Sequence, residues 1–264
     1  MLTNEYKESL LKQLESMEGT VAMYYKNLVT GDEFAYNENE SLQPASVIKL
    51  PVFLRYLQLA DEGKISLQDT IHCTDADKVG GCGAVKAFPG EVDFPIETLL
   101  KLMIQISDNT ATNLIINNIG REEMDASFAD MGLKVTHLNR IMFDSVRAAM
   151  GIENSISAGE MGMLFEKLYK GEWVSREVSD YALEVLKGQQ INHKIPGYIG
   201  PYALPYAHKT GEDDGISNDV GIVYAKEPFI LCFVSTGTDV PVWERFMRQT
   251  ALELFNDCGG KAEA

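Results

Sequence analysis

The chain has 264 residues, 45% of them hydrophobic and 23% charged, with a formal net charge of −16 at pH 7. This length permits one large domain or two closely packed subdomains, so neither a metal nor a disulfide is needed for stability, and we expect no cofactor. The negative charge argues against nucleic acid or an anionic membrane as a partner, and we interpret it mainly as a contribution to solubility.

The N-terminal segment predicts a helix followed by a β-hairpin. Residues 1–6 lack the basic and apolar regions of a signal peptide. No apolar run is long enough to cross a bilayer, so we expect a cytoplasmic protein without a membrane partner, unless a leader has been removed. Apolar residues at helical spacing predict a helix over residues 3–18. Segments 20–26 and 33–36 flank a Thr-Gly-Asp turn at 30–32, a pattern typical of a hairpin.

The stretch Ser46-Val47-Ile48-Lys49 opens an apolar run, residues 50–60, that predicts a helix buried on nearly every face. Residues three apart share a helix face, so we expect the Ser46 hydroxyl beside the Lys49 amine at the first turn. A serine becomes nucleophilic when a base takes its proton, and a buried lysine with a lowered pKa can be that base. The N–H groups of a helix N-terminus also suit an oxyanion at Ser46.

The middle of the chain is mainly helical by its apolar spacing. Residues 64–95 are rich in glycine, aspartate and proline, and we expect the greatest flexibility at 80–83. The long segment 136–157 is irregular, and such loops are often functional. The predicted helices span 96–106, 108–120, 121–131, 158–169 and 177–186.

The C-terminal part changes to strands and a closing helix. The predicted strands span 206–210, 220–224 and 229–235. An apolar stripe from Trp243 to Phe255 predicts the final helix. Because strands come from both ends of the chain, we predict an α/β (α+β) fold, an antiparallel sheet with flanking helices and an inserted all-helical subdomain. The single domain 1–264 would comprise an α/β subdomain (1–45 and 185–264) and a helical subdomain (46–184).

Two further motifs follow in order. Ser107-Asp108-Asn109 lies between two predicted helices and, alone, is more typical of helix-capping residues. Lys209-Thr210-Gly211 ends a predicted strand and, alone, is unremarkable. The Ser-x-x-Lys spacing also recurs at residues 9–12, which we interpret as solvated positions of the first helix. Together, the three motifs supply a nucleophile with its lysine, a second hydroxyl with an amide, and a cation with a hydroxyl on a strand edge.

This set of motifs resembles that of the class A β-lactamases and penicillin-binding proteins. The resemblance covers nearly the whole chain and is best from Met103 to Gly120. More narrowly, the chain is similar to serine hydrolases of this superfamily from Firmicutes that lack a signal peptide. The resemblance implies the β-lactamase/transpeptidase-like fold, a helical insertion in an α/β sandwich.

The resemblance implies catalytic roles for four residues of the first two motifs. Ser46 would be the acylated nucleophile, and Lys49 its base or proton shuttle. Ser107 would relay the proton to the leaving nitrogen. Asn109 would hold Lys49 and the amide of the substrate.

The strand motif is implied to bind the substrate. Lys209, also a catalytic candidate, and Thr210 would bind a substrate carboxylate beside Gly211. The backbone N–H groups of Ser46 and Glu212 would form the oxyanion hole. Two lysines near one serine should also lower each other's pKa by like-charge repulsion. The chain departs from the family at residues 212–214, where three acids oppose an anionic substrate unless their side chains point away.

A second departure concerns the water that breaks the acyl bond. Class A enzymes carry Arg-x-Glu-x-x-Leu-Asn in a loop whose glutamate activates that water. Leu138-Asn139-Arg140 matches the start of this loop, but the glutamate position falls on Met142 and the asparagine position on Val146. Neither side chain can take a proton from water.

Asp144 is the carboxylate nearest to the missing glutamate, and Glu153 is another. We consider Asp144 a possible deacylation residue. The alternative, of equal weight, is that it braces the loop by pairing with Arg140 or Arg147. Without an efficient base, we expect deacylation to be the weak step.

These observations predict a serine acyl-hydrolase of the class A β-lactamase family, acting on a β-lactam or related amide through an acyl-serine. The expected partner is therefore a small-molecule substrate. One alternative is a penicillin-binding-protein-like amidase or esterase for another substrate. Another is a β-lactam-binding domain that is acylated without efficient turnover. The four histidines show no metal-ligand spacing, and the four cysteines read as reduced thiols, with a Cys73–Cys82 bridge as an alternative.

Overall fold

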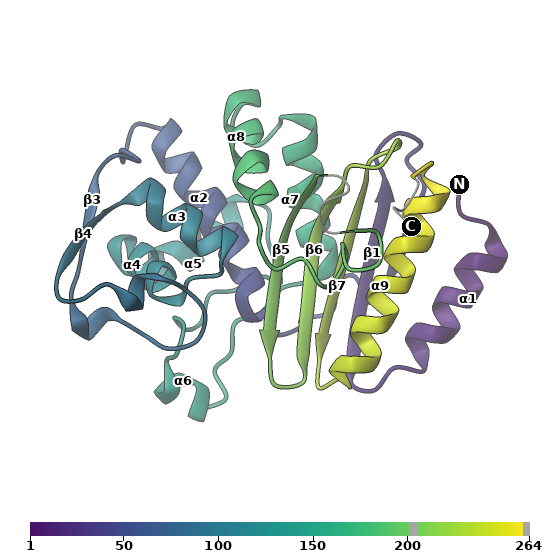
Figure 1. Cartoon of the computed structure of the whole chain (residues 1–264), viewed down its shortest axis with the longest axis horizontal. Helices are drawn as coiled ribbons and strands as arrows, with labels where there is room; N and C mark the ends of the chain where they lie inside the picture. The colour runs from purple at the N-terminus through teal and green to yellow at the C-terminus, as the bar shows by residue number, and fades with distance from the viewer. Residues whose placement is uncertain (201–204, 261–264) are drawn as a thin grey trace.

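The computed structural model describes residues 1–200 and 205–260. Its centre is a five-stranded antiparallel sheet with the strand order β2-β1-β7-β6-β5 (Figure 1). Both ends of the chain contribute strands, so the predicted fold class is confirmed. The strands are β1 (Thr20–Asn27), β2 (Glu33–Tyr36), β5 (Tyr206–Asp213), β6 (Ile216–Val223) and β7 (Phe229–Thr236).

Strand residues alternate between two hydrophobic clusters, one on each face of the sheet. Along β1, Val21 and Met23 belong to the cluster beneath α1 (Asn4–Glu15) and α9 (Val240–Asp257), while Ala22 and Tyr24 belong to the opposite cluster. This is the two-residue period expected when both faces of a sheet are covered. Figure 1 shows α1 and α9 together on one side of the sheet, close to both chain ends.

The other face of the sheet packs against the helical part of the molecule. Gly162 of α7 lies so close to β1 that an added Cβ would be 2.3 Å from the Tyr24 ring. Lys26 of β1 and Glu166 of α7 form an ion pair of 2.7 Å. The helices are α2 (Lys49–Asp61), α3 (Ile96–Gln105), α4 (Asn109–Ile119), α5 (Arg121–Asp130), α6 (Ser145–Ala149), α7 (Ala158–Lys170) and α8 (Arg176–Lys187).

Helix α2 is buried on nearly every face, as its apolar run predicted. Its core residues join those of α7 and of one sheet face in a single cluster. The division at residues 45 and 185 into two subdomains therefore stays a proposal, because one core crosses it. The proposed α/β subdomain includes residues 201–204 and 261–264, which lie outside the described residues.

The structure corrects three details of the sequence interpretation. The glycine-, aspartate- and proline-rich segment 64–95, to which no strand was assigned, contains a small sheet of β3 (Thr70–Cys73) and β4 (Val92–Pro95). The irregular segment 136–157 contains α6. Strand β5 continues to Asp213, because its pairing with β6 extends to the 213–216 turn. All four cysteines are free thiols. Within the described residues, no helix is long and apolar enough to cross a membrane.

Candidate active site

Ser46 lies in a 3-10 turn, Ala45–Ile48, that leads directly into α2. Ala45 has a φ of 44°, a left-handed conformation that costs energy for a residue with a Cβ and often marks a functional site. Ser46 is partly exposed, whereas Lys49 is completely buried. Residues three apart eclipse one another in a 3-10 turn, so this turn is compatible with the expected proximity of the two side chains, which stays a prediction. Within the described residues, no hydrogen bond joins them directly.

The Lys49 amine instead reaches the Ser107-Asp108-Asn109 motif. Its Nζ donates to Ser107 O at 2.8 Å, to Ser107 Oγ at 3.1 Å and to Asn109 Oδ1 at 2.8 Å. Lys209 Nζ donates to Ser107 Oγ at 3.2 Å and to Thr210 O at 2.8 Å. The Ser107 hydroxyl is therefore held between two lysine amines that come from opposite sides of the site. We call Lys49, Ser107, Asn109 and Lys209 the lysine cluster.

Both lysines of the cluster have lowered pKa values. Burial, followed by repulsion from Lys209, lowers the pKa of Lys49 well below its usual value. Burial, followed by repulsion from Lys194, lowers the pKa of Lys209 to about 7. A lowered pKa is the property that a lysine needs in order to act as a general base. Ser107 itself has a φ of 57°, a second strained residue at the centre.

The turn between α3 and α4 carries the Ser107-Asp108-Asn109 motif, which both caps a helix and contributes to the lysine cluster. Asp108 caps α4 by accepting from Ala111 N at 2.9 Å, as a capping residue should. Its other oxygen accepts from Ala84 N and Val85 N, at 2.6 and 2.8 Å, and so anchors the glycine-rich loop. Gly83 allows this approach, because an added Cβ would lie 2.3 Å from the Asp108 carboxyl carbon. Asp108 is therefore structural, while its neighbours Ser107 and Asn109 belong to the lysine cluster.

Strand β5 places its backbone directly against the nucleophile. It is the edge strand of the sheet, so N–H groups on its outer side are free of sheet pairing. An added Cβ on Gly211 would lie 3.0 Å from Ser46 N and 2.5 Å from Pro44 O. Only a glycine permits this approach. The residues proposed for the oxyanion hole, Ser46 and Glu212, are therefore neighbours.

Lys194 is a buried cation that the sequence analysis missed. Its Nζ donates to Gly211 O at 3.1 Å and to Asn218 O at 3.2 Å, and lies 3.0 Å from Glu212 Oε1. It precedes Ile195, whose N–H donates to the buried carboxylate of Asp219 at 3.1 Å. No spacing pattern marks this lysine, because its burial depends on the fold of the segment between α8 and β5.

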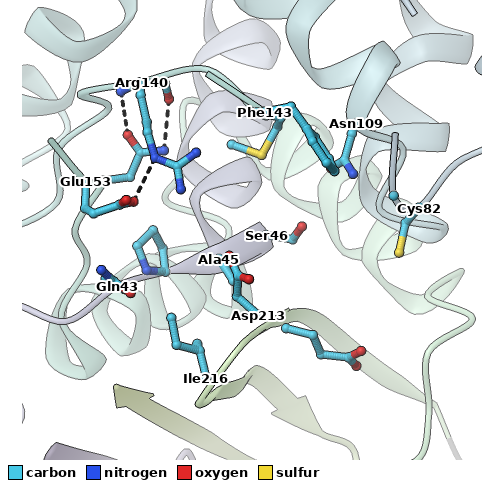
Figure 2. A pocket seen from close by; sticks show the side chains of 15 residues that line it. Gln43, Ala45, Ser46, Cys82, Asn109, Arg140, Phe143, Glu153, Asp213 and Ile216 are labelled. Carbon is cyan, nitrogen blue, oxygen red and sulfur yellow. Dashed lines mark hydrogen bonds and ion pairs between the residues drawn. The ribbon is translucent and has the colours of Figure 1, made fainter. Parts of the chain in front are cut away.

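A cavity of about 280 Å³ opens over Ser46. In Figure 2, Ser46 lies near the centre, with Arg140 and Glu153 on one side and Asn109 and Cys82 on the other. Residues 138–154, which we call the facing loop, form the side opposite the strand edge.

The facing loop presents apolar side chains to the cavity. Asn113 of α4 fixes it by accepting from Met142 N at 2.8 Å and donating to Met142 O at 2.9 Å. Met142 and Phe143 both line the cavity. Phe143 has a φ of 62° and lies over Gly81, where an added Cβ would be 2.9 Å from its ring.

The carboxylates of the facing loop are engaged in bracing it. Asp144 caps α6 through Arg147 N at 3.0 Å and lies 3.7 Å from Arg147 Nε, and it is not among the cavity-lining residues. Glu153 lines the cavity but pairs with Arg140 Nε at 2.7 Å. This geometry favours the bracing alternative for Asp144, with Arg147 rather than Arg140 as its partner.

His208 has a structural role. His208 is buried, and its ring nitrogens each lie 2.8 Å from an oxygen, Asp219 Oδ1 on one side and Asn192 Oδ1 on the other. It thereby ties the segment that carries Lys194 to the sheet. Among the described residues, no group of three or more His, Cys, Asp or Glu side chains could hold a metal ion.

Comparisons with known proteins identify the family and the fold. A family model described as the β-lactamase enzyme family matches residues 4–260. The β-lactamase ROB-1 of Haemophilus influenzae is 22% identical over 236 residues, covering 88% of this chain and 76% of the relative. A β-lactamase structure from Sphaerobacter thermophilus has a TM-score of 0.88 at 24% identity and covers 98% of both chains. A PBP-A mutant, described as an acyl-enzyme complex with penicillin G, has a TM-score of 0.86 at 24% identity and covers 95% of both chains. The predicted β-lactamase-like fold is confirmed.

Proposed function

The chain belongs to the β-lactamase enzyme family, and from this premise we propose that it forms an acyl-enzyme at Ser46 and releases it slowly. The observation that carries the proposal is the lysine cluster. One serine hydroxyl lies 3.1 Å from Lys49 and 3.2 Å from Lys209, beside a partly exposed serine at the start of a helix. The partner we propose is a small amide or ester, and a β-lactam is the first candidate.

Acylation needs a nucleophile, a base, an oxyanion site and an acid for the leaving group. We assign the base to neutral Lys49, which takes the Ser46 proton as Oγ attacks the substrate carbonyl. The backbone N–H groups of Ser46 and Glu212 stabilise the oxyanion. When the carbonyl carbon's bond to nitrogen breaks, the proton passes from Lys49 through Ser107 Oγ to the leaving nitrogen. The two hydrogen bonds to Ser107 support this route.

Deacylation needs a base that activates water, and the facing loop offers a poor one. Met142 cannot take a proton, Glu153 is paired with Arg140, and Asp144 is paired with Arg147. Lys49 is the base that stays available for both half-reactions. Losing a dedicated general base costs a step roughly 10²–10⁴-fold. We therefore propose that the acyl-enzyme accumulates.

Two measurements test this proposal: the absorbance of a chromogenic cephalosporin during hydrolysis, and mass spectrometry of the protein after treatment with a penicillin. We expect a burst of product equal to the enzyme concentration, followed by slow turnover, and a penicillin adduct on the intact protein that peptide mapping assigns to Ser46. The matched controls are Ser46→Ala, which should give no adduct, and Ser9→Ala, which removes the other Ser-x-x-Lys serine and should change nothing.

Three results would contradict the proposal. An adduct at Ser9, or undiminished labelling of Ser46→Ala, would refute the nucleophile assignment. Rapid penicillin turnover without a detectable adduct would refute slow deacylation and favour an efficient β-lactamase. Acylation by esters or peptide amides but not by β-lactams would favour the penicillin-binding-protein-like alternative.

A further inference from the structure

Glu212 forms an ion pair with Lys194, the buried cation beside strand β5. Lys194 is completely buried, and its Nζ lies 3.0 Å from Glu212 Oε1. A buried ammonium group without a carboxylate partner is strongly destabilising, so this pairing is expected to persist. The Glu212 side chain is 51% exposed at the same time, so it also reaches the cavity that it lines.

The position of this carboxylate coincides with the expected substrate subsite. Alternate residues of a strand point to the same side, so Thr210 and Glu212 share one side of β5. Thr210 is the hydroxyl that the family resemblance assigns to a substrate carboxylate. An incoming carboxylate would have to displace Glu212 from Lys194 or lie beside its negative charge.

Among the described residues that line the cavity, Arg140 is the one cation. Lys209, which the resemblance assigns to a substrate carboxylate, is not among them and donates to Ser107 Oγ and Thr210 O. Arg140 is paired with Glu153 at 2.7 Å. Asp213 adds a further carboxylate to the lining, and among the described residues no ion pair neutralises it. The cavity lining thus carries three carboxylates, Glu153, Glu212 and Asp213, and one cation, Arg140. Like charge at a binding surface rejects a partner by repulsion.

We propose that Glu212 is a specificity-determining residue, an internal carboxylate that occupies the anion subsite. The preferred substrate is then an amide or ester whose group next to the strand edge is positively charged or, second best, neutral. An anionic group is disfavoured there. The effect on reaction rate rests on the acylation of Ser46 proposed above, whereas the effect on binding does not.

Three probes that share one β-lactam ring separate charge from reactivity: benzylpenicillin, its methyl ester and its choline ester. The measurement is the rate constant for adduct formation on Ser46, divided by the rate of hydrolysis of each probe by hydroxide. The variant is Glu212→Gln, which keeps the shape of a half-exposed side chain. The charge-matched control is Asp214→Asn, an exposed residue of the β5–β6 turn that does not line the cavity.

For the wild type we expect the normalised rate constant to be highest for the choline ester, lower for the methyl ester and lowest for the free acid. In Glu212→Gln the free acid should gain at least about tenfold relative to the choline ester, the size of one charge-assisted hydrogen bond. Asp214→Asn should leave that ratio within about twofold, because exposed charges are screened. A free acid that reacts fastest in the wild type, or an unchanged ratio in Glu212→Gln, would overturn the proposal.

Calorimetric binding of the same probes to Ser46→Ala separates this proposal from the previous one. Charge-ranked binding without any adduct on the wild type would uphold the role of Glu212 and refute acylation. An adduct without charge ranking would do the reverse. If the experiments detect no binding and no adduct, both proposals are refuted.

Discussion

The two sides of the cavity differ in how they are built. The lysine cluster is almost completely buried, and its polar atoms are joined at 2.8–3.2 Å. The facing loop exposes Phe143, 58% accessible, and uses its charged residues to brace itself. The residues that we propose make the acyl bond are therefore buried and hydrogen-bonded to one another, whereas the carboxylates of the facing loop are paired with arginines. In the proposed mechanism Lys49 serves both half-reactions, but a dedicated base for deacylation would have to come from the facing loop, so efficient acylation does not require efficient deacylation.

The largest effect should come from the lysine cluster itself. Lys49→Ala removes the proposed base, and we expect the acylation rate constant to fall roughly 10²–10⁴-fold. Lys209→Ala removes mainly a substrate contact and should raise KM more than it lowers the rate constant. Stopped-flow acylation with a chromogenic cephalosporin gives both constants, and circular dichroism controls for folding. Equal losses of the rate constant would contradict this division of roles.

A gain of function in the facing loop would sharpen the comparison. Met142→Glu places a carboxylate at the backbone position that Asn113 fixes. We expect deacylation to accelerate about 10²-fold, toward the lower end of what a general base supplies. The decay of the penicillin adduct measures this rate. Val146→Glu, at a 70% exposed position of the same loop, is the matched control and should change little. No difference between the two variants would show that the loop cannot present a base.

Asp144→Asn tests the bracing role in the same assay. Asparagine is as good a helix cap as aspartate, and the pair with Arg147 is long, at 3.7 Å. We expect the deacylation rate to change less than about threefold, as for the loss of an exposed ion pair. A loss of two orders of magnitude would instead identify Asp144 as the base.

The smallest effect concerns the pH dependence of stability. Folded Lys209 loses its proton near pH 7, whereas the unfolded chain holds that proton to about pH 10. Between these values the unfolded state binds more protons, so Lys209 makes stability rise with pH, and its buried charge destabilises the fold below pH 7. Urea titrations should show the wild type gaining on Lys209→Met as pH rises over this interval. Lys12→Met, at an exposed position, controls for the loss of one charge, and a constant wild-type to Lys209→Met difference would contradict the shift.

The sequence is most informative where structure depends on neighbours along the chain. The Ser46–Lys49 spacing, the cap at Asp108 and the alternating strands are local patterns, so the fold and the proposed catalytic residues could be predicted. Lys194, the Arg140–Glu153 pair and the strained backbone at Phe143 depend on contacts between distant segments. Asp144 shows the limit of sequence patterns. The pattern places a carboxylate near the position of the missing glutamate, but it does not determine where that side chain points.

The pairing of β1 with β7 determines when the active site comes into existence. Thr20 pairs with Thr236, so β1, the first strand to be synthesised, cannot form this pairing until β7 has been synthesised near the end of translation. Lys209 also arrives long after Ser46 and Lys49 have been synthesised. Such long-range pairing is slow, because loop closure must precede the contacts that reward it. A growing chain therefore carries its serine without the strand edge and second lysine of the finished site, and a chain truncated before β7 should lack the activity altogether.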